Sequence, residues 1–238
     1  MSFIYQISNK NNIARIPAKV ETQKDYIDML LNTCEFFISN NKYVNKFFKY
    51  SPQLFDIIII EKRIFIFFSA DKYVSAYFPF SFEFTGGIFH YNEFLINQKS
   101  ISHLKSLNEC INNEKKIDDA FASCNLDVSI GDEEYISDEE KTVMTLLLKS
   151  EPCYLRYDYD PKNENGKKHP LFHLDVNFFK YGNWKIGLHD MITPYRFCQI
   201  FNKENDCEFF ENENLAKKDK SLALTQLMQL LFMNKNKP

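Results

Sequence analysis

Apolar residues follow two different periods along the N-terminal half of the chain. In residues 22–40 they recur at steps of three and four, which predicts a helix with Thr22 as its N-cap. Residues 78–84 alternate phenylalanine with other residues, which predicts a strand. Because proline cannot donate a ladder hydrogen bond, Pro79 places that strand at a sheet edge. Further predicted elements are strands at 55–60 and 64–68, a turn at 85–87 and two short helices between residues 100 and 125.

A capping signal opens a helix in the second half of the chain. Ser137 and Glu140 have the spacing of a capping box, in which each side chain accepts the other residue's backbone N–H. We expect this helix to run to about Lys149. The side chains expected to be buried on it are Val143, Leu146 and Leu147.

Beyond this helix the pattern returns to strands and then to helices. Thr193 and Pro194 predict a helix start, since proline at the first helical position sacrifices no hydrogen bond. The other predicted elements are strands at 154–160, 171–178 and 184–188 and a leucine-rich closing helix at 221–233.

Together these elements predict an α+β protein. We expect a mixed or antiparallel sheet, flanked by helices, whose C-terminal hairpin carries a cluster of polar residues. A single domain over residues 1–238 is the expected organisation, because no long Gly/Ser linker divides the chain. The alternative is an N-terminal subdomain at 1–130 followed by a subdomain at 131–238 that carries the polar motifs.

The polar cluster follows from the alternation of side chains along two predicted strands. Arg156 and Asp158 share one face of the first strand, and His173 and Asp175 share one face of the second. The insert at 161–168 contains turn residues and permits an antiparallel hairpin. Pairing the apolar faces brings the polar groups to one side, with neighbours about 4.5–5.5 Å apart.

Three kinds of chemistry can use such a cluster, and the sequence leaves all three open. His169, His173 and Asp158 could ligate a divalent metal such as Mg²⁺, Mn²⁺ or Zn²⁺. Alternatively, the cluster could catalyse a reaction by transferring protons, with or without a metal; its candidate catalytic residues are His169, His173, Asp158 and Asp175. Anion binding is the third use, and its candidate residues are Arg156, Thr193 and Arg196.

A purely structural interpretation stands beside these. An arginine and an aspartate on adjacent strands often form a cross-strand ion pair, which is the simpler explanation for Arg156 with Asp158 alone. We interpret the larger group, with His169 and His173, as a functional site, because desolvating so many charges for structure alone is costly.

Charge and composition narrow the classes of function. The net charge of −3 and the pI near 6.0 argue against a protein that coats nucleic acid by bulk electrostatics. There is neither a Walker-type phosphate loop nor a G-x-G-x-x-G motif. The six cysteines form no C-x-x-C pair, so we expect buried free thiols. No signal peptide and no continuous apolar span is apparent, so we expect a cytoplasmic protein without membrane contact.

Three motifs in order resemble the C-terminal part of an uncharacterised prokaryotic domain-of-unknown-function family. They are LRYDYD at 155–160, HPLFHLDV at 169–176 and ITPYRFCQIF at 192–201. The chain departs from the family's pattern at Asp175, where a further histidine is usual, and at 187–189, where an arginine–proline pair is usual. The resemblance implies a shared type of site and no particular reaction. By analogy, such bacterial proteins often accompany phage-defence or mobile-element genes.

Two hypotheses about function follow. The first is a phosphodiester-directed hydrolase, either a nuclease or a nucleotide phosphodiesterase, linked to defence or toxicity, that acts on nucleic acid or nucleotides. The second is a non-catalytic binding module of a multi-protein bacterial system, which recognises an anion, a nucleic acid or a protein. In that case the closing helix at 221–233 would supply a protein interface.

Overall fold

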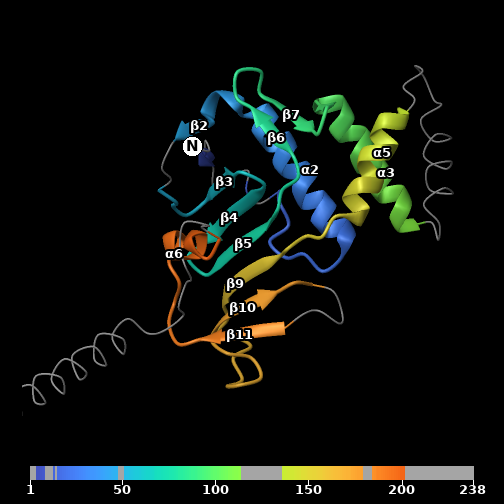
Figure 1. The fold of residues 1–238 in the computed structure, drawn as a ribbon. Helices are drawn as coiled ribbons and strands as arrows, with labels where there is room; N and C mark the ends of the chain where they lie inside the picture. Colours follow the sequence, from blue (N-terminus) through green and yellow to red (C-terminus); the bar gives the residue numbers. More distant parts are fainter. Residues whose placement is uncertain are drawn as a thin grey trace, which may run out of the picture.

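The computed structural model describes residues 4–8, 13, 15–47, 51–113, 136–178 and 184–201. It combines helices with two antiparallel sheets, which confirms the predicted α+β class (Figure 1). In chain order the elements are β1 (Ile4–Ser8), α2 (Gln23–Ser39), the 3₁₀ turn η1 (Asn41–Tyr43), β2 (Asn45–Phe47), β3 (Asp56–Ile60), β4 (Arg63–Ser69), β5 (Lys72–Tyr77), β6 (Ser81–Glu83), β7 (Ile88–Tyr91), β8 (Phe94–Ile96), α3 (Gln98–Asn113), α5 (Asp138–Lys149), β9 (Leu155–Tyr159), β10 (Phe172–Val176), β11 (Trp184–Leu188) and α6 (Pro194–Gln199).

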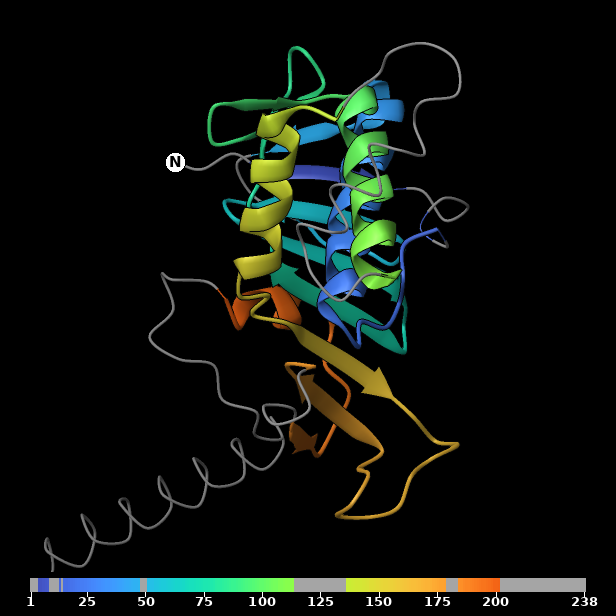
Figure 2. The ribbon, with the colours of Figure 1, turned by 90° about the vertical axis from the view of Figure 1, so that its right-hand side faces the viewer.

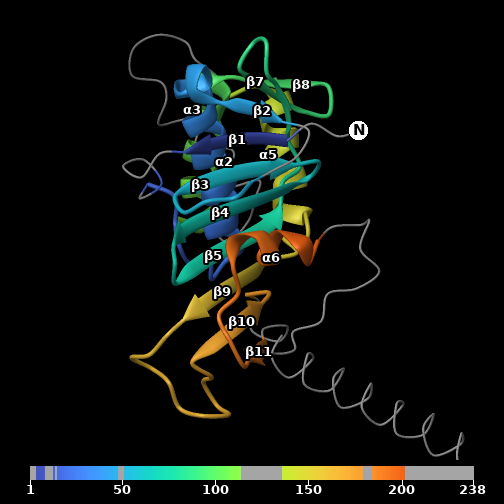
Figure 3. The same ribbon diagram turned by 90° about the vertical axis from the view of Figure 1, so that its left-hand side faces the viewer.

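The large sheet organises the molecule. Its eight strands run in the order β11-β10-β9-β5-β4-β3-β1-β2, and a separate sheet has the order β6-β7-β8. Helices α2, α3 and α5 lie on one side of the large sheet, and strands β9 and β10 continue past the ends of these helices (Figure 2). The short helix α6 lies on the opposite face (Figure 3). The β9–β11 end of the sheet therefore has one face that these three helices leave uncovered.

The centre of the sheet is apolar on both faces because it is covered on both. On β4, Ile64 and Ile66 belong to the core under α2, while Phe65 and Phe67 turn to the other face. There both phenylalanine rings contact Phe197 of α6 in edge-on geometry. A strand buried on two faces has a continuous apolar sequence, as IFIFF does.

The predicted helix starts are confirmed. Thr22 caps α2 and forms a capping box with Asp25, while Ser137 caps α5 in a capping box with Glu140. Thr193 caps α6 by accepting the backbone N–H of Arg196.

The buried stripe of α5 is only partly as predicted. Val143 and Leu147 are buried, but Leu146 is 38% exposed and Met144 is buried in its place. Met144 shares the buried face of α5 with Val143 and Leu147, which faces α3 and α2, whereas Leu146 lies on the solvent side of that face.

The prediction of one strand over 78–84 is wrong. The strand β5 ends at Tyr77 and β6 begins at Ser81, with Pro79 in the break between them. Proline lacks the N–H that would have continued the ladder. The side chains of Phe78, Phe80 and Phe82 are nevertheless buried in the core, whereas Phe84, the last phenylalanine of the alternation, is 36% exposed.

The states of the cysteines are only partly as predicted. Cys34 and Cys198 are buried free thiols and Cys153 is an exposed one, but Cys110 is disulfide-bonded, which corrects the expectation of free thiols.

Among the described residues, no helix has the length and apolar character needed to cross a membrane. The closing helix predicted at 221–233 lies outside the described residues, as does the segment between 113 and 136.

The pairing of β5 with β9 unites strands from both sides of residue 130 in one sheet. The number of domains stays a prediction.

Candidate functional site

The predicted C-terminal hairpin is present. Strands β9 and β10 pair antiparallel, with Asp158 opposite His173 and Arg156 opposite Asp175. The connecting insert is closed by an isolated bridge between Asn165 and His169, and Gly166 takes the positive φ of 50° that this turn requires. The local sequence therefore determines the register that brings the polar groups together.

The neighbouring strands extend this polar face on both sides. Lys72 of β5 is in register with Asp158, and Lys185 of β11 is in register with Asp175. Charges consequently alternate across four adjacent strands. We call this row the charge ladder, and its members in spatial order are Lys72, Asp158, Arg156, Asp175 and Lys185.

Arg156 joins the two carboxylates of the charge ladder. Its Nε donates to Oδ2 of Asp158 at 2.6 Å, and its Nη2 donates to Oδ2 of Asp175. The side chain is 11% exposed, and those of Asp158 and Asp175 are 10% and 8% exposed. Such a nearly buried, charge-assisted pairing fixes both carboxylates in place.

The two lysines pair with the remaining carboxylate oxygens. Lys185 Nζ donates to Oδ1 of Asp175, and Lys72 Nζ lies 3.6 Å from Oδ1 of Asp158. The latter oxygen is buried and accepts no hydrogen bond from the residues that the structure describes. The charge ladder thus holds three cations against two carboxylates, and its weakest pairing is at Asp158 Oδ1.

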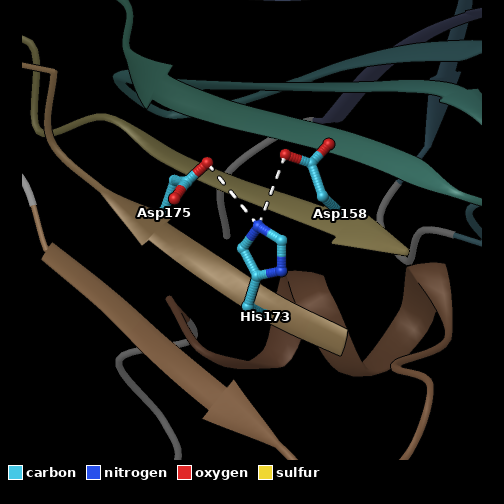
Figure 4. A group of neighbouring side chains, drawn as sticks. All are labelled: Asp158, His173 and Asp175. Carbon is cyan, nitrogen blue, oxygen red and sulfur yellow. Dashed lines mark ion pairs between the residues drawn. The ribbon is translucent and has the colours of Figure 1, made fainter. Parts of the chain in front are cut away.

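His173 lies at the centre of this group and is 1% exposed. Its Nδ1 is 2.8 Å from the carbonyl oxygen of Pro170, so Nδ1 carries the proton and donates it. The lone pair on Nε2 then faces Asp158 and Asp175, each with an oxygen 3.9 Å away, as Figure 4 shows. Lys185 Nζ is 3.0 Å from this nitrogen and can donate to it.

The pKa directions agree with this arrangement. Burial lowers the pKa of His173, helped by the charge of Lys185, and this outweighs the opposite effect of the Pro170 carbonyl and the carboxylates. His173 is therefore neutral at pH 7. Burial alone would raise the pKa of Asp175, but the hydrogen bond from Lys185 and the charge of Arg156 lower it. Asp175 is accordingly ionised at neutral pH.

An open cleft of about 960 Å³ lies over the hairpin and gives access to the charge ladder. We call it the hairpin cleft. Its lining carries both signs of charge and aromatic rings, and the members outside the charge ladder include Lys19, Glu21, Asp71, Tyr154, Asp160 and His169. A bound ligand could reach the ladder's lysines directly, whereas His173 lies beneath them.

The structure brings together four of the predicted site residues and sets the others apart. Arg156, Asp158, His173 and Asp175 form one group. His169 Nε2 is 3.1 Å from Asp160 Oδ2 at the rim of the hairpin cleft, although its ring still contacts that of His173 with centroids 4.7 Å apart. In the three-residue group that can converge on one cation, Asp175 therefore takes the place predicted for His169: the group is Asp158, His173 and Asp175.

Thr193 and Arg196 do not join Arg156. They belong to α6, whose Phe197 packs on the opposite face of the sheet against Tyr73 and its neighbours. Thr193 accepts the backbone N–H of Arg196 as an ordinary helix cap. The predicted anion-binding set is thus divided between two faces of the sheet.

The sequence interpretation missed the two lysines. Lys185 could have been found, because its strand was predicted correctly. Alternation places Lys185 on the face of that strand opposite to Trp184 and Ile186. Lys72 could not have been found, because β5 was not predicted as a strand and its pairing with β9 is non-local.

No protein-family model, curated protein or solved structure matches the chain. The resemblance of the three C-terminal motifs to a prokaryotic family stays a prediction.

The donor set suits a divalent cation with mixed ligand preference. One neutral imidazole nitrogen and two carboxylates have candidate ligand atoms within 4.8 Å of one another. Imidazole and carboxylate together are suitable ligands for Mn²⁺ or Zn²⁺. The bond from His173 Nδ1 to a backbone carbonyl is the support that a metal-ligating histidine usually has.

Proposed function

We propose that the chain is a metal-dependent phosphodiester hydrolase, of the nuclease or nucleotide phosphodiesterase kind, whose metal is held by Asp158, His173 and Asp175. The observation that carries this proposal is the unprotonated Nε2 of His173, which faces two nearly buried carboxylates from a fixed tautomer. When bound there, a divalent metal would activate water or polarise a phosphoryl oxygen.

The residues around the cluster have complementary roles in this proposal. Lys72 and Lys185 reach the hairpin cleft and would neutralise the charge of a bound phosphodiester. Arg156 would position the two carboxylates, since its donors already point at them. The pair of His169 with Asp160 is partly exposed at the cleft and would accept or donate a proton there.

The proposal is tested by hydrolysis of RNA, single-stranded DNA and a chromogenic phosphodiester, with Mn²⁺ and with EDTA. We expect activity that EDTA abolishes and that His173→Ala and Asp158→Asn remove. His169→Ala should lower kcat by about 100-fold, as expected for the loss of a general acid or base.

The matched control is His90→Ala, which removes a histidine–carboxylate pair on β7, in the other sheet. This variant should keep full activity. Because His173 is buried, His173→Gln is tested beside His173→Ala, and circular dichroism establishes that each variant is folded. A folded His173 variant with wild-type activity, or hydrolysis that persists in EDTA, would refute the proposal.

One observation favours a second candidate, a non-catalytic binding module. The charge ladder already compensates both carboxylates without a metal, and a lysine stands at each end of it. In that case an anion such as a phosphate group of a nucleic acid would bind across Lys72 and Lys185 without turnover. Binding of a fluorescent oligonucleotide that is unaffected by EDTA and lost in a Lys72→Met, Lys185→Met double variant, with no hydrolysis, would support this candidate.

A further inference from the structure

The three cations of the charge ladder are held in two different ways. Arg156 takes Oδ2 of both carboxylates and is 11% exposed. Lys72 and Lys185 approach from the hairpin cleft, and their side chains are 35% and 30% exposed. Arg156 is thus enclosed in the group, while each lysine could leave by moving into the cleft.

Lys185 contacts two of the three candidate metal ligands at once. Its Nζ donates to Asp175 Oδ1 and lies 3.0 Å from His173 Nε2. A metal ion bound to His173 would need the same Nε2 lone pair that the ammonium group contacts. The two cations therefore exclude one another at His173.

The position of Lys185 allows it to move. It lies on β11, the last strand of the eight-stranded sheet. Its ammonium group is carried on a flexible four-carbon stem, which lets the charge change place without a change in the backbone. Lys72 differs in its partner rather than in its freedom to move, because its ammonium group pairs with Asp158 Oδ1 at 3.6 Å and not with the His173 Nε2 lone pair that Lys185 contacts.

We propose that Lys185 is a displaceable internal cation that occupies the metal position in the metal-free protein. The inference rests on the metal site of the proposed function. In the metal-free state Lys185 compensates Asp175 and caps His173 Nε2, and a divalent cation drives the ammonium group into the hairpin cleft. Lys185 thus opposes metal binding and, once displaced, adds a positive charge beside the position of a bound phosphate.

The first test is calorimetric titration of Mn²⁺ into the wild-type chain, Lys185→Met and Lys19→Met. Lys19 is the matched control, because it lines the same cleft but pairs with Glu21 instead of the candidate ligands. We expect Lys185→Met to bind Mn²⁺ about tenfold more tightly than wild type, since a like charge is removed from the site. Lys19→Met should bind like wild type.

The second test follows Lys185 in the wild-type chain and so does not depend on the folding of a variant. Limited acetylation with acetic anhydride, read by mass spectrometry of peptides, measures the reactivity of Lys185 against that of Lys19. An amine engaged in buried ion pairs reacts slowly. We expect Mn²⁺ to increase the reactivity of Lys185 relative to Lys19.

The outcomes separate the inference from the proposed function. If wild type binds Mn²⁺ while the reactivity of Lys185 is unchanged and Lys185→Met binds no more tightly, the displacement is refuted and the metal site stands. If Lys185→Met binds Mn²⁺ more weakly, Lys185 supports the metal and the inference is likewise refuted. If neither the wild type nor Lys185→Met binds Mn²⁺ or Zn²⁺, both the inference and the metal site are refuted.

Discussion

Asp56 and Asp175 are buried carboxylates toward opposite ends of the same sheet, and their partners are of opposite kinds. Asp56, on β3, is fully buried, and Asp175, on β10, is 6% exposed. The partners of Asp175 are cations, Arg156 and Lys185. The hydrogen bonds that Asp56 accepts within the described part of the chain come from neutral groups: Gln6 Nε2, Ser8 Oγ and the backbone N–H of Gln53.

The pKa directions of the two groups differ accordingly. Burial raises the pKa of Asp56, and its neutral hydrogen bonds offset only part of that effect. Burial acts in the same direction on Asp175, yet Lys185 and Arg156 reverse it and lower the pKa. Burial of a carboxylate therefore does not by itself indicate function. Cationic partners and access from a cleft distinguish Asp175 from Asp56. The role of Asp56 is structural, because its hydrogen bonds connect β1 and the 51–55 segment to β3.

The largest change in stability is expected when Asp175 is substituted. Asp175→Asn keeps the shape of the side chain but leaves Arg156 and Lys185 facing a neutral group. Because breaking a nearly buried ion pair leaves charge uncompensated, we expect the free energy of unfolding to fall by about 3 kcal/mol. Guanidinium unfolding at pH 7 in EDTA measures it. A loss below about 1 kcal/mol would mean that solvent in the hairpin cleft compensates the two cations.

Much of the fold could be predicted because its signals are local. The capping residues Thr22 and Ser137 mark helix starts through contacts within three residues. The hairpin of β9 and β10 follows from period-two alternation and a short turn. Strand β5 was missed because its sequence, KYVSAY, is less apolar than that of β4, and because one of its two neighbouring strands, β9, is distant in sequence.

The site could be predicted only as far as the hairpin itself. Arg156, Asp158, His173 and Asp175 converge because one turn fixes their register. Lys72 comes from β5, and its pairing with Asp158 depends on a strand order that alternation does not encode. Lys185 lies on β11, a strand that was predicted, so alternation could have added this residue to the site. The grouping of Thr193 with Arg156 failed for a related reason, since a chain segment gives no indication of which sheet face its helix will cover.

A smaller effect is expected on the Asp56 side. In Asp56→Asn the amide oxygen can still accept from Gln6 and Gln53, and the Ser8 hydroxyl can turn to accept from the new amide N–H. The lost hydrogen-bond strength is offset because a charge is no longer buried. We expect the free energy of unfolding at pH 7 to change by no more than about 1 kcal/mol. The same guanidinium unfolding experiment tests this, and a loss as large as that of Asp175→Asn would show that the two sites are alike.

The smallest expected effect is a difference in how these two variants respond to acid. The lowered native pKa of Asp175 makes its stabilisation complete above the unfolded carboxyl pKa, about 3.9, and lost as pH falls through the native pKa. The advantage of wild type over Asp175→Asn should therefore shrink in acid. For Asp56 the native pKa is raised, so the native state takes up a proton before the unfolded state does.

The free energy of unfolding of wild type, relative to that of Asp56→Asn, should consequently increase as pH falls from 7 toward about 4. Unfolding at a series of pH values, in EDTA, measures both differences. Their slopes against pH should have opposite signs, because cationic partners favour the charged form of one carboxylate and burial favours the neutral form of the other. Slopes of the same sign would mean that the partners of Asp175 do not outweigh its burial, and the charge ladder would then lose its role as the feature that keeps this carboxylate ionised.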